Sequence, residues 1–241
     1  MELVQSPVPE LKGLLTESFE QWAASLRQGY GEPGSLSCAL SGGATALIFL
    51  PALRAAKVDW SKITLFWADE RAVEPDDPES NYGLADRMLL SPLGRKAPRA
   101  IRMTFDSPNL WDAARNYDNI LARELSGRPL DLAVLGVGDD GHIASLFPAH
   151  DALLEDHARV VAVDDAPKHP KRRLSLTMRY LLQTQNIWIV AVGARKLPVI
   201  QAALSRTQKA TPIDQILLLQ GKRVTVFTDQ VIRSVSASRQ A

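Results

Sequence analysis

The chain has 241 residues, of which 46% are hydrophobic and 23% charged, as expected of a globular protein with a sizeable core. Its 28 basic and 27 acidic side chains leave a formal net charge of +1, so no overall electrostatic field attracts nucleic acid or a membrane surface. Cys38 is the only cysteine, which excludes an intrachain disulfide and makes a cysteine-based zinc site implausible.

At its start, MELVQSPVPELKG, the chain lacks the basic and apolar regions of a signal peptide, and no run of about 18 apolar residues follows, so we expect a cytoplasmic protein. Short apolar runs then alternate with amphipathic segments. The runs that predict strands are residues 35–40, 62–68, 100–104, 132–137, 159–164, 173–177, 187–193 and 223–228. The helical patterns are residues 8–28, 45–57, 81–90, 108–126, 195–204 and 212–219.

This alternation predicts an α/β fold, a three-layer αβα sandwich with a mainly parallel, Rossmann-like central sheet. Several strands are apolar at consecutive positions, which indicates that both faces of the sheet are covered. The chain has no long linker, repeat or low-complexity tract, so we expect one domain over residues 1–241. Because such sheets bind ligands beyond the carboxyl ends of their strands, the loops at those ends are the candidate site.

The loop after the first strand reads LSGGAT and contains Gly42, Gly43 and Thr45. Free N–H groups at the start of the following helix favour an anion, and the glycines let a phosphate or sugar approach the backbone. No lysine follows, so the loop is not a nucleotide P-loop, and Ser41 lacks the GxSxG setting of a nucleophile. An ordinary capped helix start is the alternative interpretation.

The next strand ends in Asp69, Glu70 and Arg71, and a helix is expected to begin near Ser80 or Asn81. Arg71 could clamp a phosphate, while Asp69 could hold a hydroxyl or a histidine. The alternative is a weak ion pair at the surface.

After the fourth strand, Gly136, Gly138 and Gly141 have the GxGxxG spacing of a dinucleotide-binding turn. Asp164, a little over twenty residues on, stands where a ribose-binding acid is expected. A dinucleotide turn must open a long helix, however, and Pro148 interrupts any helix here. This spacing alone is therefore weak evidence for a dinucleotide.

The same glycines allow a sharp turn from which Asp140 and His142 project, and a carboxylate beside an imidazole suits general-base catalysis. The alternative is that Asp139 and Asp140 cap a short helix beginning near Gly141. The spacing of the histidines is not that of metal ligands, so we expect no metal.

Basic residues gather before the sixth strand and after the seventh. Lys168 and Lys171 are expected to be solvated, whereas Arg173 alternates with Ser175 and can point inward. Lys196 falls in the first turn of a helix, where a cation opposes the helix dipole, which suggests a role in ligand binding.

Four stretches together resemble 6-phosphogluconolactonases in order and spacing: LSGGAT, FWADERAVEPDDPESNYG, LGVGDDGHIASLFP and RRLSLT followed by VGARK. The resemblance extends roughly from Leu40 to Lys196, and DGHxASLFP is its most specific part. The related glucosamine-6-phosphate deaminases share the fold and the DGH element but continue IAFNEP, where this chain reads IASLFP.

The resemblance implies hydrolysis of 6-phosphoglucono-δ-lactone to 6-phosphogluconate in the pentose phosphate pathway, without metal or organic cofactor. It makes His142 the base that activates water and Asp69 the residue that orients His142 or the substrate, with Asp140 as the other candidate partner of His142. It assigns phosphate and substrate binding to Arg71, Arg173 and Lys196, with Gly42, Gly43 and Thr45 lining the sugar phosphate.

The chain departs from the family pattern at Ala44, Ala46, Ala68 and Ile143, which leaves the substrate range open. Two alternatives remain, namely an amino-sugar-phosphate deaminase or isomerase and a non-catalytic sugar-phosphate binding module. The expected partner is a small phosphosugar lactone, not nucleic acid or a membrane. The sequence leaves the oligomeric state open, with a monomer slightly favoured.

Overall fold

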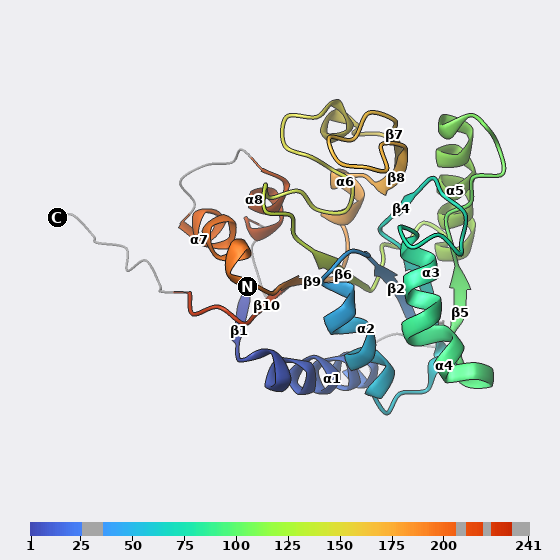
Figure 1. The fold of residues 1–241 in the computed structure, drawn as a ribbon. Helices are drawn as coiled ribbons and strands as arrows, with labels where there is room; N and C mark the ends of the chain where they lie inside the picture. The colour runs from blue at the N-terminus through green and yellow to red at the C-terminus, as the bar shows by residue number, and fades with distance from the viewer. Residues whose placement is uncertain (26–35, 206–210, 219–222, 233–241) are drawn as a thin grey trace.

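A seven-stranded sheet, parallel at every pairing, forms the centre of the molecule (Figure 1). The computed structural model describes residues 1–25, 36–205, 211–218 and 223–232. In spatial order the strands are β1 (Glu2–Gln5), β10 (Val224–Thr228), β9 (Asn186–Ala191), β6 (Leu132–Gly136), β2 (Leu36–Leu40), β3 (Ile63–Trp67) and β5 (Arg99–Ile101). Every residue of β3 and β10 is buried, as the unbroken apolar runs predict.

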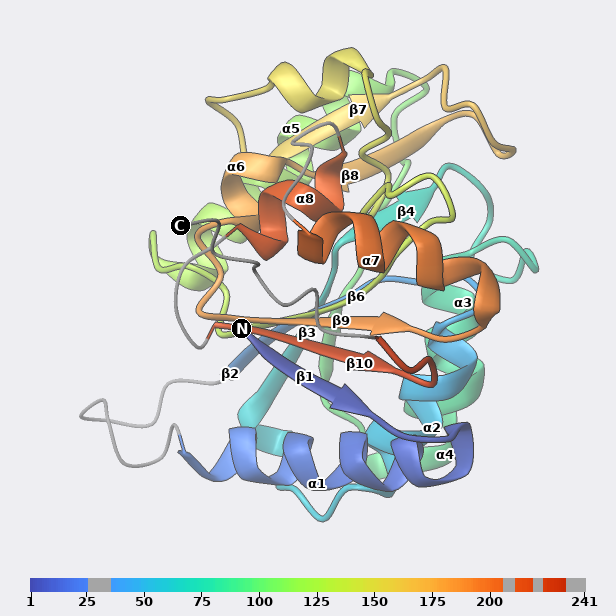
Figure 2. The same cartoon turned by 90° about the vertical axis from the view of Figure 1, so that its left-hand side faces the viewer.

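Helices cover both faces of this sheet and make three layers, which confirms the predicted sandwich (Figure 2). One face carries α1 (Val8–Ser25) and α2 (Ala46–Ala55), and the other carries α7 (Leu197–Ser205) and α8 (Pro212–Leu217). The helix predicted near Asn81 is α3 (Asn81–Ala85), which runs through a π-helical turn into α4 (Ser91–Leu93). Residues 26–28, 35 and 219, which were assigned to predicted elements, lie outside the described residues.

A second, antiparallel sheet contains β4 (Asp69–Arg71), β8 (Arg173–Leu176) and β7 (Val160–Val163). The helix α5 (Leu110–Leu125) packs against β7 and β8, and α6 (Met178–Leu181) follows β8. Both predicted strands at 159–164 and 173–177 exist, but they belong to this small sheet rather than to the central one. Its register sets Arg71 opposite Arg173, so two distant basic residues become neighbours.

The chain order of the central strands reverses between β2 and β6, because the chain passes from β2 outward through β3 to β5 and returns at β6. Loops diverge at such a switch point and leave a crevice at the carboxyl ends of the strands. Here Ser41 joins the two ends: its Oγ accepts a hydrogen bond from the Gly136 N–H at 2.8 Å, and its own N–H donates to Val134 O at 3.0 Å. The loops after β2 and β6 therefore lie side by side.

Within the described ranges, no helix is both long enough and apolar enough to cross a membrane.

Candidate active site

A cavity of about 460 Å³ lies at the switch point, within the size range of small-molecule sites. Among its lining residues are His142, Asp69, Gly42, Gly43, Thr45, Arg71, Arg173 and Lys196, so all the predicted site residues except Asp140 reach it. Five cationic side chains line the cavity against two carboxylates. This excess of positive charge suits an anionic ligand.

His142 is paired with Asp140, which lies behind it rather than on the cavity wall. Its Nδ1 lies 2.5 Å from Asp140 Oδ1, and its ring packs against Phe147 at 4.7 Å between centroids. Because a carboxylate only accepts, Nδ1 carries the proton and Nε2 keeps a lone pair. No described residue hydrogen-bonds Nε2, so this nitrogen is available as a base.

Burial acts to raise the pKa of Asp140, but the hydrogen bond and charge of His142, with the charge of Lys168, outweigh it and hold the pKa well below its usual range. The carboxyl group is therefore ionised at any pH at which an enzyme is assayed. An ionised partner orients the imidazole and stabilises the imidazolium that forms when His142 takes a proton.

Gly138 makes room for this pair. A Cβ at Gly138 would lie 1.9 Å from His142 Nδ1 and 2.4 Å from Asp140 Oδ1, both far inside contact distance. Gly141 has a φ of +83°, which closes a turn through its N–H to Gly138 O at 3.0 Å. No helix follows Gly141, so the alternative in which Asp139 and Asp140 cap one is wrong, and a dinucleotide turn has no helix to open.

The side chains of Asp69 and Glu70 point to opposite sides of β4. Asp69 lines the cavity, and its Oδ2 accepts a hydrogen bond from Ser145 Oγ at 2.7 Å rather than from His142. Burial raises the pKa of Glu70, which accepts from the N–H groups of Asn81 and Tyr82 at 2.7 Å each. Glu70 thus anchors the start of α3, and of the two only Asp69 lines the cavity.

In the loop before α2, no described residue accepts a hydrogen bond from the N–H groups of Gly42, Gly43 or Ala44. Gly43 has a φ of +74°, and a Cβ at Gly42 would lie 1.8 Å from Asn81 Oδ1, so both positions require glycine. Unpaired N–H groups at a helix start attract an anion. Ala44, one of the departures from the family pattern, contributes only its backbone N–H to this arrangement.

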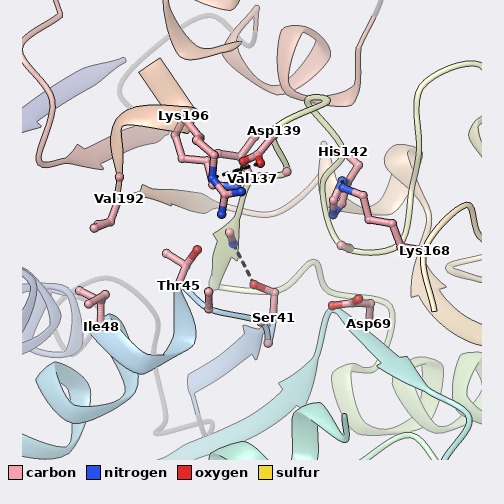
Figure 3. Close-up of a pocket in the computed structure, with 18 of the residues that line it drawn as sticks. Ser41, Thr45, Ile48, Asp69, Val137, Asp139, His142, Lys168, Val192 and Lys196 are labelled. Carbon is pink, nitrogen blue, oxygen red and sulfur yellow. Dashed lines mark hydrogen bonds and ion pairs between the residues drawn. The ribbon is translucent and has the colours of Figure 1, made fainter. Parts of the chain in front are cut away.

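Lys196 ends a turn of 3₁₀ helix, Ala194–Lys196, that leads directly into α7. Its Nζ lies 2.5 Å from Asp139 Oδ1, and this hydrogen bond holds the pKa of Asp139 below its usual value. Figure 3 shows Lys196 and Thr45 on one side of the cavity, with His142, Lys168 and Asp69 on the other. The cavity thus has one end formed by Lys196 and the loop before α2 and another that holds His142, with cations at both.

Arg71 and Arg173 are cross-strand neighbours in the small sheet and both line the cavity. Arg71 Nη1 donates to Glu79 O at 2.6 Å and pairs with its carboxylate at 3.4 Å, so the ion-pair interpretation also has a basis. Arg173 is only 4% exposed, as its predicted inward direction requires. Burial, followed by the charge of Arg71, lowers the pKa of Arg173.

Lys168 is exposed, as expected, but it also lines the cavity, and its Nζ lies 3.3 Å from Asp140 Oδ2. A run of basic residues does not reveal which of its members reaches a distant carboxylate, so the sequence carried no signal for this contact. Asp139, the partner of Lys196, was likewise not assigned to the site.

No group of three or more histidine, cysteine or acidic side chains among the described residues is placed to hold a metal ion.

The chain is similar to known proteins in sequence and in fold. Residues 9–226 match the family model described as glucosamine-6-phosphate isomerases/6-phosphogluconolactonase. The Mycobacterium tuberculosis 6-phosphogluconolactonase is 38% identical over 71% of this chain and 73% of its own length. The rat 6-phosphogluconolactonase is 36% identical over 87% of this chain and 83% of its own length.

Solved structures share the fold over nearly all of the chain. The Shewanella baltica 6-phosphogluconolactonase superposes with a TM-score of 0.80 at 28% identity, covering 95% of this chain and 97% of that one. The Trypanosoma brucei 6-phosphogluconolactonase gives a TM-score of 0.78 at 25% identity, covering 94% and 95%. The chain therefore belongs to the family of glucosamine-6-phosphate isomerases and 6-phosphogluconolactonases.

Proposed function

We propose that this protein hydrolyses 6-phosphoglucono-δ-lactone to 6-phosphogluconate, the lactone-opening step of the pentose phosphate pathway. The observation that carries the proposal is His142, whose Nδ1 is engaged by a carboxylate and whose Nε2 is unpaired among the described residues, in a cationic cavity. The names of the similar enzymes from Mycobacterium tuberculosis and rat support the same substrate.

In this mechanism, Nε2 of His142 removes a proton from a water molecule as the water oxygen attacks the lactone carbonyl carbon. Asp140 stabilises the imidazolium that results. The tetrahedral intermediate then expels the ring oxygen, which takes the proton back from Nε2, so the base is regenerated and a carboxylic acid and a hydroxyl are produced. The acid releases its proton to solvent and becomes the carboxylate. The cations of the cavity stabilise the charge that develops on the carbonyl oxygen.

The phosphate is assigned to the end of the cavity that holds Lys196 and the Gly42–Thr45 loop. Unpaired N–H groups and an ammonium there supply the donors that a phosphate requires. Arg71 and Arg173 add positive charge from the small sheet. Asp69, held by Ser145, is placed to accept a hydrogen bond from a sugar hydroxyl.

Lys196→Ala and Arg71→Ala are each expected to raise KM for the phosphorylated lactone by about tenfold or more, the usual effect of losing a charged hydrogen bond. The measurement is initial-rate kinetics, corrected for spontaneous hydrolysis. Unphosphorylated glucono-δ-lactone is the matched control, because its turnover does not depend on a phosphate site. An unchanged KM in both variants contradicts the phosphate assignment.

The two alternatives make different predictions in the same assays. A deaminase releases ammonia from glucosamine 6-phosphate, whereas a binding module binds 6-phosphogluconate and leaves the lactone to decay at its background rate. We expect lactone hydrolysis well above background and no ammonia. A single domain, a cytoplasmic location and activity without a metal or cofactor stay predictions.

A further inference from the structure

Lys168 contacts both members of the catalytic pair from a separate loop. Its Nζ lies 3.3 Å from Asp140 Oδ2 and 3.5 Å from His142 Nδ1. Figure 3 shows Lys168 beside His142. The carboxylate of Asp140 is thus held at both oxygens, Oδ1 by His142 and Oδ2 by Lys168.

The backbone of this loop is fixed by Arg173. The Nε of Arg173 donates to Pro170 O at 2.7 Å, and Nη2 donates to Lys168 O at 2.9 Å and to His169 O at 3.2 Å. The buried guanidinium group therefore donates three of its five N–H groups to three consecutive carbonyl groups. A fourth, from Nη1, reaches Ser145 Oγ at 3.5 Å. These hydrogen bonds hold the Lys168 backbone beside His142.

We propose that Lys168 is a positioning residue that balances the charge of Asp140, so that His142 stays unprotonated and correctly oriented at neutral pH. The kinetic consequence rests on the proposed function, whereas the electrostatic effect on His142 does not.

The physical reason is that a carboxylate by itself favours the charged imidazolium, which cannot act as a base. An ammonium beside the same ring disfavours the imidazolium and offsets the carboxylate. An ammonium also has donors only, so it cannot take the Nδ1 proton, and that proton stays directed at Asp140. Nε2 then keeps its lone pair towards the cavity.

The other charged groups around the cavity have partners of their own. On β4, Asp69 holds Ser145 and Arg71 holds Glu79. Arg173 on β8 holds the loop carbonyls, and Lys196 before α7 holds Asp139, as does the more distant Arg195. Lys168 is therefore the cation placed to oppose Asp140 directly.

The test replaces Lys168 by methionine, which keeps the length of the side chain and removes its charge. We expect the NMR titration midpoint of the His142 ring to rise by about 0.5–1 pH unit, the effect of one unit charge at this distance in a solvated setting. The acid limb of kcat/KM moves to higher pH by the same amount, so the variant is several-fold slower at pH 6 and close to wild type at pH 8.

Lys171→Met is the matched control, because Lys171 is exposed on the same loop. It should leave the midpoint unchanged, and Lys168→Arg should restore it. The shift should also shrink at high salt, because the Lys168 side chain is half exposed. Lys168→Gln provides a second uncharged variant if the methionine variant folds poorly.

An unchanged His142 midpoint in both uncharged variants overturns the proposal, even if their melting temperature falls, because a purely structural lysine alters stability without altering the ring titration. A shifted midpoint in a protein without lactonase activity leaves the charge balance standing and rejects the proposed function. The two failures are therefore distinguishable.

Discussion

His142→Ala is expected to lower kcat for 6-phosphoglucono-δ-lactone by about 10²-fold or more, the usual scale for a lost general base. The structure explains why no neighbour can substitute. Asp140 carries a carboxylate whose lowered pKa makes it a poor base, and Lys168 next to it is a cation. Single-turnover and steady-state rates, corrected for spontaneous hydrolysis, measure the effect.

His157→Ala is the matched control, because its side chain is 94% exposed and should leave kcat unchanged. The pH profile adds a second readout. Asp140 stays ionised as the pH falls, since its pKa is lowered, so the wild-type kcat at saturating lactone should fall on the acid side because His142 becomes protonated. This limb should disappear in His142→Ala. Equal rates for the variant and wild type would remove His142 from the reaction.

Gly138→Ala is expected to reduce kcat by a similar factor, about 10²-fold, although glycine and alanine differ by one methyl group. The added Cβ would lie 1.9 Å from His142 Nδ1, so the imidazole must leave its position or lose Asp140. A displacement of about 1 Å at a catalytic group is enough for a loss of this size. Steady-state kinetics and the ring signal of His142 measure the change.

Gly13→Ala is the control for this substitution. Nothing lies within 4 Å of a Cβ at Gly13, which sits within α1, so alanine there should stabilise the protein by roughly 0.5–1 kcal/mol and leave kcat unchanged. Gly138→Ala should keep the circular dichroism spectrum of the wild type. Full activity in Gly138→Ala would show that the imidazole does not need its observed position.

Much of the fold can be predicted from local sequence patterns. The eight predicted runs all form strands, because runs of apolar, β-branched residues have few other structures in which to bury themselves. Sheet membership is a different matter: β7 and β8 pair with β4 rather than with the central strands. The hydrophobic pattern of a strand does not indicate which other strand it pairs with. The short strand at Asp69–Arg71 went unpredicted because its polar residues are typical of a loop.

For the site, too, the sequence predicted which residues take part but not how they pair. Glycine-rich loops and strand-end charges identified the residues that line the cavity, because the parallel sheet brings those loops together. Pairings within the site were not predictable. Whether Asp69 or Asp140 contacts His142 depends on a turn that Gly138 and Gly141 permit. That Lys168 reaches Asp140 depends on its loop, which Arg173 holds from another element.

The ion pair between Lys196 and Asp139 means that the cavity carries its own counterion. A phosphorylated ligand that binds Lys196 must displace the carboxylate of Asp139. The net free energy of the contact is therefore the difference between the interaction of Lys196 with the phosphate and its interaction with Asp139. A phosphate dianion displaces Asp139 more readily than a phosphate monoanion does. Phosphate monoesters change from the dianion to the monoanion as the pH falls through ~6. Acidification should therefore weaken ligand binding through protonation of the ligand's own phosphate group.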